Sequence, residues 1–231
     1  MIEKLRISLN AYGPFWFLWH LTWEVRMRIK WTLLKSYSQC GEDILMDKLL
    51  RKKRKGFYVD IGAYDPTRFS NTKRFYLRGW RGINIEPEPT RAVKFNVSRP
   101  KDINLNIGVA NKTGELKFYI FNPPTLSTFS KRKAEDYQKQ GFELKKTSNI
   151  KVQTLGDVLK KYHQGYIDFF SIDTEGFDFE VLKSNNWNKF RPKVICIESS
   201  QKNVDKLLSK LGYKRIYKTD VNSIFYYGKF R

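Results

Sequence analysis

Four acidic residues stand at the ends of short apolar runs, where they could do chemistry. They are Asp60, Glu86, Asp173 and Glu198. The runs are typical of buried parallel strands, and the carboxyl ends of such strands meet at one edge of a sheet, where ligands bind. Because like charges gathered together cost free energy unless a cation or hydrogen-bond donors compensate them, the four acids predict a binding site at that edge.

The stretch FYVDIGAYDP, residues 57–66, indicates what the first two acids could bind. Gly62 and Ala63 form a small-residue turn after Asp60, and such a turn lets the backbone approach a ligand closely. Glu86, at the end of the next run, can accept two hydrogen bonds from a ribose diol. The turn lacks the glycines of GxGxxG and begins with an acid that would repel a pyrophosphate, which disfavours a nicotinamide oxidoreductase. A nucleoside with a cationic group fits better, and we predict S-adenosylmethionine.

The pattern of apolar residues predicts the elements that must position these acids. Helices are expected at 38–53, with Ser38 as N-cap, and at 70–77, 89–97, 154–162, 179–182 and 204–211. Strands are expected at 56–62, 81–89, 103–111, 115–121, 166–176, 192–199, 214–217 and 223–227. This order predicts an α/β fold with a mostly parallel sheet and helices on both faces. Residues 123–150 have few core positions and are expected to form an irregular, substrate-facing insertion.

Seven segments give a more specific interpretation. They are SYSQCGEDIL, FYVDIGAYDP, SNTKRFYLRGWRGINIEPEP, NIGVAN, VQTLGDVL, FFSIDTEGFDFEVLKS and FRPKVICIES. In this order they resemble FkbM-type methyltransferases, over residues 36–200 of the chain. The resemblance implies a class I methyltransferase (Rossmann-like) fold, with a seven-stranded, mostly parallel sheet of order 3-2-1-4-5-7-6 whose last strand is antiparallel. It also implies transfer of a methyl group from S-adenosylmethionine to oxygen, commonly to a sugar hydroxyl of a glycan or natural product.

The resemblance also implies a set of cofactor-binding residues, carried over position by position. The set is Gln39, Glu42, Asp60, Gly62, Ala63, Glu86, Asn106, Gly108 and Val109. Asp60 and its turn would line the methionine part, Glu86 would hold the ribose, and residues 106–109 would flank the adenine. The motif around Gln39, which includes Asp43, would close over the cofactor. Asn71 and Thr72 match a further sequence motif of the family, and they could equally well cap a helix.

Asp173, Glu175 and Glu198 are the candidate catalytic residues. A sugar hydroxyl has a very high pKa, so a base or a metal ion must assist its attack. The three carboxylates could ligate Mg²⁺ or Mn²⁺, which prefer oxygen ligands, or one of them could act directly as the base. Glu175 could instead cap the following helix through the turn at Gly176. A histidine base is not expected, because Ser199 follows Glu198 where many relatives have a histidine.

The charge of the chain constrains its partners. Its 231 residues include 44 Lys and Arg against 23 Asp and Glu, which gives a net charge of +21. Such an excess attracts polyanions, although a merely solvated basic surface would have the same composition. No nucleic-acid module is recognisable, which disfavours nucleic acid as the partner. The resemblance implies a saccharide or glycolipid acceptor, and the positive charge would suit one of acidic character. Two isolated cysteines suit a reducing compartment and predict a cytoplasmic protein.

Residues 12–31 combine four tryptophans with Arg26, Arg28 and Lys30. The apolar core is too short to span a bilayer. The composition is typical of a helix that lies at a membrane surface, with cations toward anionic lipid. The alternative is a helix that packs on its own domain or mediates dimerisation. We therefore divide the chain into a helical extension at 1–35 and a methyltransferase domain at 36–231.

Two other functions remain open from the sequence. One is methylation of a non-sugar small molecule; methylation of nucleic-acid bases is disfavoured, because IDTEG stands where the [DNS]PP[YF] signature would be. The other is a non-catalytic binding module that retains the fold. Loss of Asp60 or Glu86 would favour such a module, and both residues are present.

Overall fold

The computed structural model describes residues 22, 25, 29–51, 53–163, 165–198, 202–219 and 221–228. Most of the predicted surface helix at 12–31 lies outside these residues, and its described end is a short π-helical turn, η1 (Lys30–Leu34). Among the described residues, none of the helices has the length and apolar character needed to cross a bilayer. The boundary between residues 35 and 36 stays a prediction.

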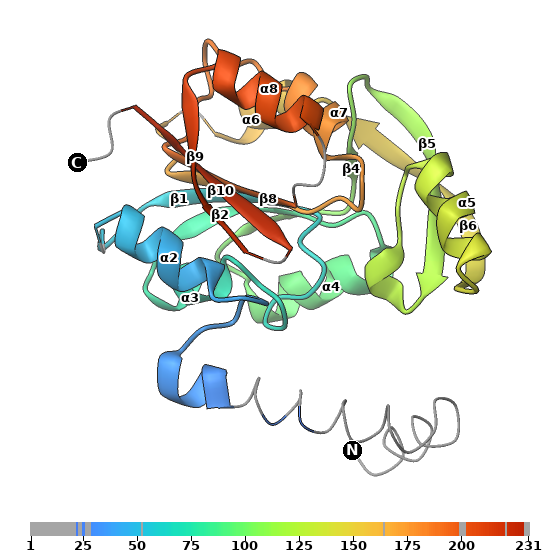
Figure 1. Cartoon of the computed structure of the whole chain (residues 1–231), viewed down its shortest axis with the longest axis horizontal. Coiled ribbons are helices and arrows are strands. Elements are labelled where there is room, and N and C mark those ends of the chain that lie inside the picture. The colour runs from blue at the N-terminus through green and yellow to red at the C-terminus, as the bar shows by residue number, and fades with distance from the viewer. Residues whose placement is uncertain are drawn as a thin grey trace.

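A seven-stranded sheet forms the centre of the molecule (Figure 1). Its strands, in spatial order, are β3 (Ile103–Leu105), β2 (Arg81–Ile85), β1 (Phe57–Ile61), β7 (Phe169–Ile172), β8 (Val194–Glu198), β10 (Asn222–Tyr227) and β9 (Tyr213–Lys218). Strand β10 runs antiparallel to both of its neighbours, whereas the other pairs are parallel. Counted within this sheet, the order is 3-2-1-4-5-7-6 with the last strand antiparallel, as predicted.

Helices cover both faces of the sheet (Figure 1). One face packs against α6 (Leu155–Tyr162), α7 (Asp178–Lys183) and α8 (Lys202–Lys210), and the other packs against α2 (Glu42–Leu49) and α3 (Lys73–Leu77). The next helix along the chain is α4 (Pro89–Ser98). Successive strand residues alternate between the two cores, so Val59 and Ile61 join the first and Tyr58 the second. Strands buried on both faces account for the continuous apolar runs in the sequence.

The segment expected as one strand at 103–111 is divided between two sheets. Residues 103–105 form β3 in the main sheet, and β4 (Gly108–Val109) pairs with a second sheet of order β4-β6-β5. Asn106 and Ile107 lie between the two strands, so the chain leaves the main sheet there. The single-strand prediction was therefore wrong.

The prediction of an irregular segment at 123–150 was also wrong. This segment contains a 3₁₀ turn, η2 (Pro124–Leu126), helix α5 (Lys131–Lys139) and most of strand β6 (Glu143–Gln153). Strand β6 pairs antiparallel with β5 (Gly114–Asn122), and Phe121, Ala134 and Tyr137 form a small core between the helix and these strands. We call residues 114–153 the insertion unit; it lies beside the main sheet in Figure 1.

Candidate active site

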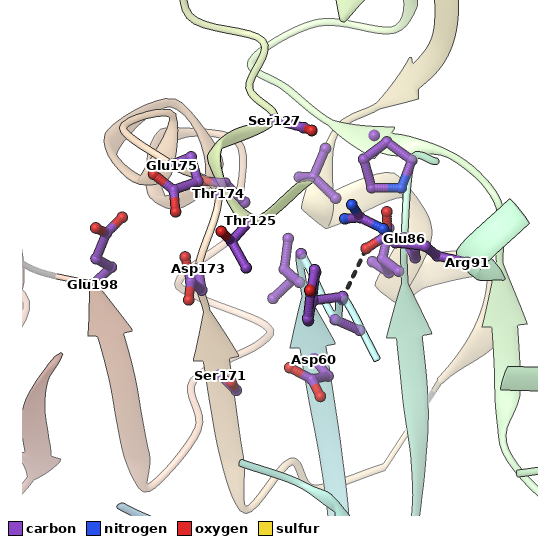
Figure 2. A pocket seen from close by; sticks show the side chains of 18 of the residues that line it. Asp60, Glu86, Arg91, Thr125, Ser127, Ser171, Asp173, Thr174, Glu175 and Glu198 are labelled. Carbon is purple, nitrogen blue, oxygen red and sulfur yellow. Dashed lines mark hydrogen bonds between the residues drawn. The ribbon is translucent and has the colours of Figure 1, made fainter. Parts of the chain in front are cut away.

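A cavity of about 350 Å³ opens at the carboxyl ends of the central strands. Asp60, Glu86, Asp173 and Glu198 all line it, so the predicted convergence of the four acids is confirmed. Figure 2 shows Glu86 with Arg91 at one end, Asp173, Glu175 and Glu198 at the opposite end, and Asp60 lower down between them. The insertion unit closes another side through Phe118, Thr125, Ser127 and Phe129. The volume suits a small organic ligand.

Glu86 is fixed by backbone donors just after β2. Its two carboxylate oxygens accept hydrogen bonds from the Tyr64 and Glu88 amides, at 2.8 and 2.9 Å. Burial raises the pKa of the Glu86 carboxyl to about 7, although these amides and the nearby Arg91 favour the charged form. Each oxygen retains a further lone pair, so the rigid carboxylate can still accept hydrogen bonds from a ligand diol.

Asn106 does not line the cavity, in contrast to the predicted contact with the cofactor. Its amide nitrogen donates to the Glu86 and Pro87 carbonyls at 2.9 and 3.0 Å, so it fixes the turn that presents Glu86. Gly108 and Val109 do line the cavity, as expected. A Cβ on Gly108 would lie 2.4 Å from the Phe129 ring, so a glycine lets β4 approach the insertion unit.

Gly62 and Ala63 lie at the tip of β1 and line the cavity. Gly62 has a φ of +76°, and a Cβ there would lie 1.8 Å from the Asp173 carbonyl oxygen. The glycine therefore lets the β1 turn pack against the end of β7. This contact brings Asp60 and Asp173, from neighbouring strands, into one wall.

Asp60 is buried, with 4% of its surface exposed. Its carboxylate accepts a hydrogen bond of 2.6 Å from the Thr72 hydroxyl and another from Ser171. Figure 2 shows its side chain close to Ser171, below the level of Asp173 and Glu175. Burial raises the pKa of Asp60, while both hydroxyls lower it by stabilising the anion.

The motif before the first strand forms its own hydrogen-bonded turn. Asp43 accepts from the Ser36 and Ser38 hydroxyls. Glu42 accepts from Thr219, which follows β9, and from Asn222, the first residue of β10. Glu42 is fully buried and does not line the cavity, so its predicted contact with the cofactor stays a prediction. Gln39 does line the cavity. Ser38 accepts from the Gly41 and Asp43 amides, whereas the residue that directly precedes α2 is Gly41.

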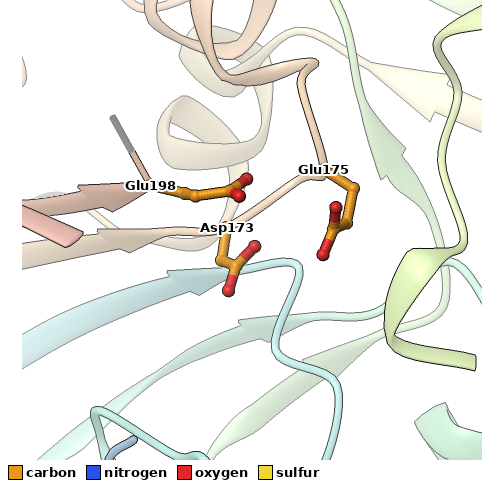
Figure 3. Close-up of side chains that lie close together, drawn as sticks. All are labelled: Asp173, Glu175 and Glu198. Atoms are coloured by element: carbon orange, nitrogen blue, oxygen red, sulfur yellow. The ribbon is translucent and has the colours of Figure 1, made fainter. Parts of the chain in front are cut away.

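Asp173, Glu175 and Glu198 lie close together at the other end of the cavity (Figure 3). One carboxylate oxygen from each residue lies within 4.8 Å of the other two. Asp173 is exposed toward the cavity, but protein atoms lie on the other sides of its carboxyl group. Burial and then the charge of Glu198 raise the pKa of Asp173 well above its usual range, and the same two causes raise the pKa of Glu175 to about 7.

Two side chains that sequence reasoning missed reach this cluster from α5. The Tyr137 hydroxyl donates to Glu175 Oε2 at 2.5 Å, and Lys133 Nζ lies 3.1 Å from that hydroxyl and 3.9 Å from Glu175 Oε2. The Thr128 hydroxyl also donates to the Glu175 carbonyl at 2.9 Å. The spacing of Lys133 and Tyr137, four apart and on one helical face, was the available signal. It was lost because the segment was expected to be irregular.

The contacts around Glu175 argue against its alternative role as the cap of the following helix. The turn before α7 is held by Asp178, which accepts from the amide and hydroxyl of Thr174 at 3.0 and 2.9 Å. The Glu175 side chain bonds to Tyr137 instead, and its backbone has a φ of +50°. A non-glycine residue in this conformation is strained, and such strain is found preferentially at functional sites. Glu175 therefore faces the cavity as part of the acid cluster.

Comparison with known proteins gives likenesses to solved structures at low sequence identity. A search of curated proteins found no match. Among solved structures, the METTL16 methyltransferase domain shares 11% identity, with 87% of this chain and 77% of that chain covered and a TM-score of 0.48. A precorrin-8W decarboxylase of Methanobacterium thermoautotrophicum shares 14%, with 81% and 89% covered and a score of 0.41. TrmK of M. capricolum, in complex with S-adenosylhomocysteine, shares 13%, with 79% and 66% covered and a score of 0.36.

The family assignment rests on the sequence rather than on these structural likenesses. Residues 60–215, more than half of the chain, match the methyltransferase FkbM domain. The match begins at Asp60, ends in β9, and includes Glu86, Asp173, Glu175 and Glu198. The chain belongs to the FkbM methyltransferase domain family.

Proposed function

We propose that the protein is an S-adenosylmethionine-dependent O-methyltransferase that acts on a sugar hydroxyl of a glycan or glycolipid. One observation carries the proposal: a single cavity joins a rigid carboxylate suited to a ribose diol, Glu86, to a cluster of carboxylates suited to a hydroxyl proton. The family assignment supports the methyl transfer, and the cluster supports oxygen as the acceptor atom.

The residues present fit the cofactor. Glu86 would hold the ribose hydroxyls, Gly108 and Val109 would flank the base, and Asp60 supplies a fixed negative charge beneath the Gly62 turn for the cationic amino-acid part. When bound, S-adenosylmethionine would supply an electrophilic methyl group, with its sulfonium sulfur as the leaving group. The chain contributes mainly proximity and orientation.

The acid cluster would orient the acceptor hydroxyl and take its proton. A general base works best when its pKa lies near the working pH, and the pKa of Glu175 is raised to about 7. The Tyr137 hydroxyl donates its hydrogen bond to Glu175 Oε2, so Oε1 is the oxygen that would take the proton of the acceptor hydroxyl. Carboxylates also accept hydrogen bonds from neighbouring sugar hydroxyls. Because this wall is anionic, the sugar ring at the reacting end is proposed to be neutral, and any acidic group of the acceptor would lie farther out.

The same carboxylates are hard oxygen ligands of the kind that Mg²⁺ or Mn²⁺ prefers. The contacts of Glu175 favour the direct base, because a phenol proton already occupies Oε2 and the Lys133 ammonium lies 3.9 Å from it. A metal ion in the cluster would be repelled by that ammonium. We therefore expect methyl transfer to persist in EDTA, and loss of activity that Mn²⁺ restores would assign the cluster to a metal instead.

The first experiment is calorimetric titration of S-adenosylhomocysteine into wild type and Glu86→Ala. A hydrogen-bonded carboxylate contributes about 1.5–3 kcal/mol, so the variant should bind roughly 10- to 150-fold more weakly. Glu115→Ala, at an exposed position of β5, is the control and should bind like wild type. A wild-type protein that does not bind S-adenosylhomocysteine would refute the proposed function.

A further inference from the structure

Arg99 carries a positive charge in the interior, far from bulk water. Its side chain is fully buried. The guanidinium donates to the Pro66 carbonyl, the Ser70 hydroxyl and the Thr72 hydroxyl, each at 2.6 Å, and to Asn84 Oδ1 at 3.3 Å. All of these acceptors are neutral, and a buried charge is costly unless an opposite charge compensates it.

Thr72 links this cation to the acid at the end of β1. Its hydroxyl oxygen accepts from Arg99 Nη1 at 2.6 Å and lies 2.6 Å from Asp60 Oδ2. A hydroxyl has only one proton. Because the Asp60 carboxylate offers the acceptor, the proton points toward Asp60, and the hydrogen bonds run in one direction, from Arg99 through Thr72 to Asp60. Thr72 is itself fully buried, so water does not compete for these bonds.

A second chain of donors ends on the same carboxylate. Asn71 Nδ2 donates to the Ser171 hydroxyl at 3.2 Å, and Ser171 hydrogen-bonds to Asp60. Asn71 and Thr72 are adjacent, so one short segment supplies both chains. The segment precedes α3, and the Ser70 hydroxyl accepts from the Thr72 and Lys73 amides at its start. Because Ser70 caps the helix, the side chains of Asn71 and Thr72 can donate hydrogen bonds in the two chains that end on Asp60.

We infer that Thr72 is a positioning residue of the cofactor site, which couples the buried charge of Arg99 to Asp60 and holds that carboxylate as a fixed anion for the ammonium of the ligand. The inference rests on the proposed function, since it takes the cavity to bind S-adenosylmethionine. The sequence motif SNT, residues 70–72, would then set the charge of the site as well as cap the helix.

The test compares Thr72→Val, which keeps the shape and removes the hydroxyl, with Thr72→Ser, which keeps the hydroxyl. Two ligands are titrated into each: S-adenosylhomocysteine, which carries the ammonium, and 5′-methylthioadenosine, which lacks the amino-acid part. With Thr72→Val, we expect S-adenosylhomocysteine to bind roughly 10-fold more weakly and 5′-methylthioadenosine to change by less than about 2-fold. Thr72→Ser should bind both ligands like wild type.

Equal weakening of the two ligands would show a general distortion of the site and overturn the inference, as would unchanged binding of S-adenosylhomocysteine. If Thr72→Val does not fold, Thr72→Ala, which also removes the hydroxyl, takes its place and should weaken S-adenosylhomocysteine alone. A wild-type protein that binds neither ligand would refute the proposed function as well. Wild-type binding with unaltered variants would refute only the role of Thr72.

Discussion

Glu86 combines a rigid position with an unfavourable charge, because the amides that fix it do not fully compensate for its burial. Its pKa is raised from 4.5 to about 7. The folded state therefore binds the proton more tightly than the unfolded state. The associated stability is fully present below pH 4.5 and is lost as the pH rises through about 7.

This shift predicts how Glu86→Gln changes the pH dependence of stability. Between pH 5 and pH 8, wild type should lose on the order of 3 kcal/mol of unfolding free energy through this group, and the glutamine variant should not. Urea denaturation at the two pH values measures the difference. Glu115→Gln, on the surface, should follow the wild-type curve. Parallel curves for Glu86→Gln and wild type would show that Glu86 titrates alike in both states.

Gly62 gives a second prediction at this scale. Gly62→Ala places a Cβ at φ +76° and 1.8 Å from the Asp173 carbonyl oxygen, whereas Gly141→Ala meets a φ of +86° with no atom within 4 Å. The left-handed backbone alone costs about 1–2 kcal/mol, so Gly141→Ala should lose that amount. Gly62→Ala should lose about 1–3 kcal/mol more through the clash. Thermal unfolding compares them, and equal losses would show that the β1 turn can move away from β7.

The strand-end acids could be predicted from the sequence because each follows an apolar run, and that run fixes the edge of the sheet at which the acid lies. Glu42 and Asn106 were also expected at the cofactor, and neither of them lines the cavity. Each is close in sequence to a residue that lines the cavity, but its side chain bonds to a distant segment, Glu42 to Asn222 and Asn106 to the Glu86 carbonyl, and only the tertiary structure reveals these partners. For Thr72 a site role and a helix cap were equally compatible with the sequence, since its partners Asp60 and Arg99 come from distant segments.

Among the elements, α5 has the clearest functional consequence, because it brings Tyr137 and Lys133 to Glu175. Its identity was hidden in the sequence. Residues 131–139 carry many charges and bury only Ala134 and Tyr137, so few apolar core positions mark the helix in the sequence. The separation of β4 from the strand predicted at 103–111 was hidden because β4 has only two residues and its partner, β6, is more than 40 positions away. Non-local pairing of this kind leaves little trace in local patterns.

Tyr137→Phe tests whether α5 takes part in catalysis. The variant removes the hydroxyl that holds Glu175 and keeps the ring in its small core. Once an acceptor is identified, kcat should fall roughly 10-fold, as expected for loss of a hydrogen bond to a charged group, while affinity for S-adenosylhomocysteine stays unchanged. Lys139→Ala, an exposed change on the same helix, is the control. Loss of cofactor affinity in Tyr137→Phe would show that α5 supports the whole cavity instead.

At the scale of the whole molecule, the net charge of +21 and the N-terminal segment point to the same kind of partner. Val25, Ile29 and Leu33 are spaced four apart and are 49%, 51% and 74% exposed. This spacing places them along one side of a helix, and basic residues stand between them in the sequence. We propose that this stripe inserts its apolar side chains into the surface of an anionic membrane, where a lipid-linked acceptor would be accessible.

Vesicle sedimentation tests the stripe in the full chain. Wild type should sediment with vesicles containing phosphatidylglycerol at low salt, and much less with pure phosphatidylcholine, because part of the attraction is electrostatic and salt screens it. Ile29→Glu combined with Leu33→Glu should weaken binding by at least about 10-fold, since each change removes roughly 1.5–3 kcal/mol of apolar burial.

The control is Leu77→Glu combined with Val97→Glu, which changes the charge equally at side chains that are 57% and 79% exposed on α3 and α4. Equal loss of vesicle binding in both double variants would show that the net charge, and not the apolar stripe, determines binding. A wild type that stays in the supernatant at low salt would exclude the membrane role, and sedimentation velocity of the same sample would then show whether the stripe joins two copies of the chain.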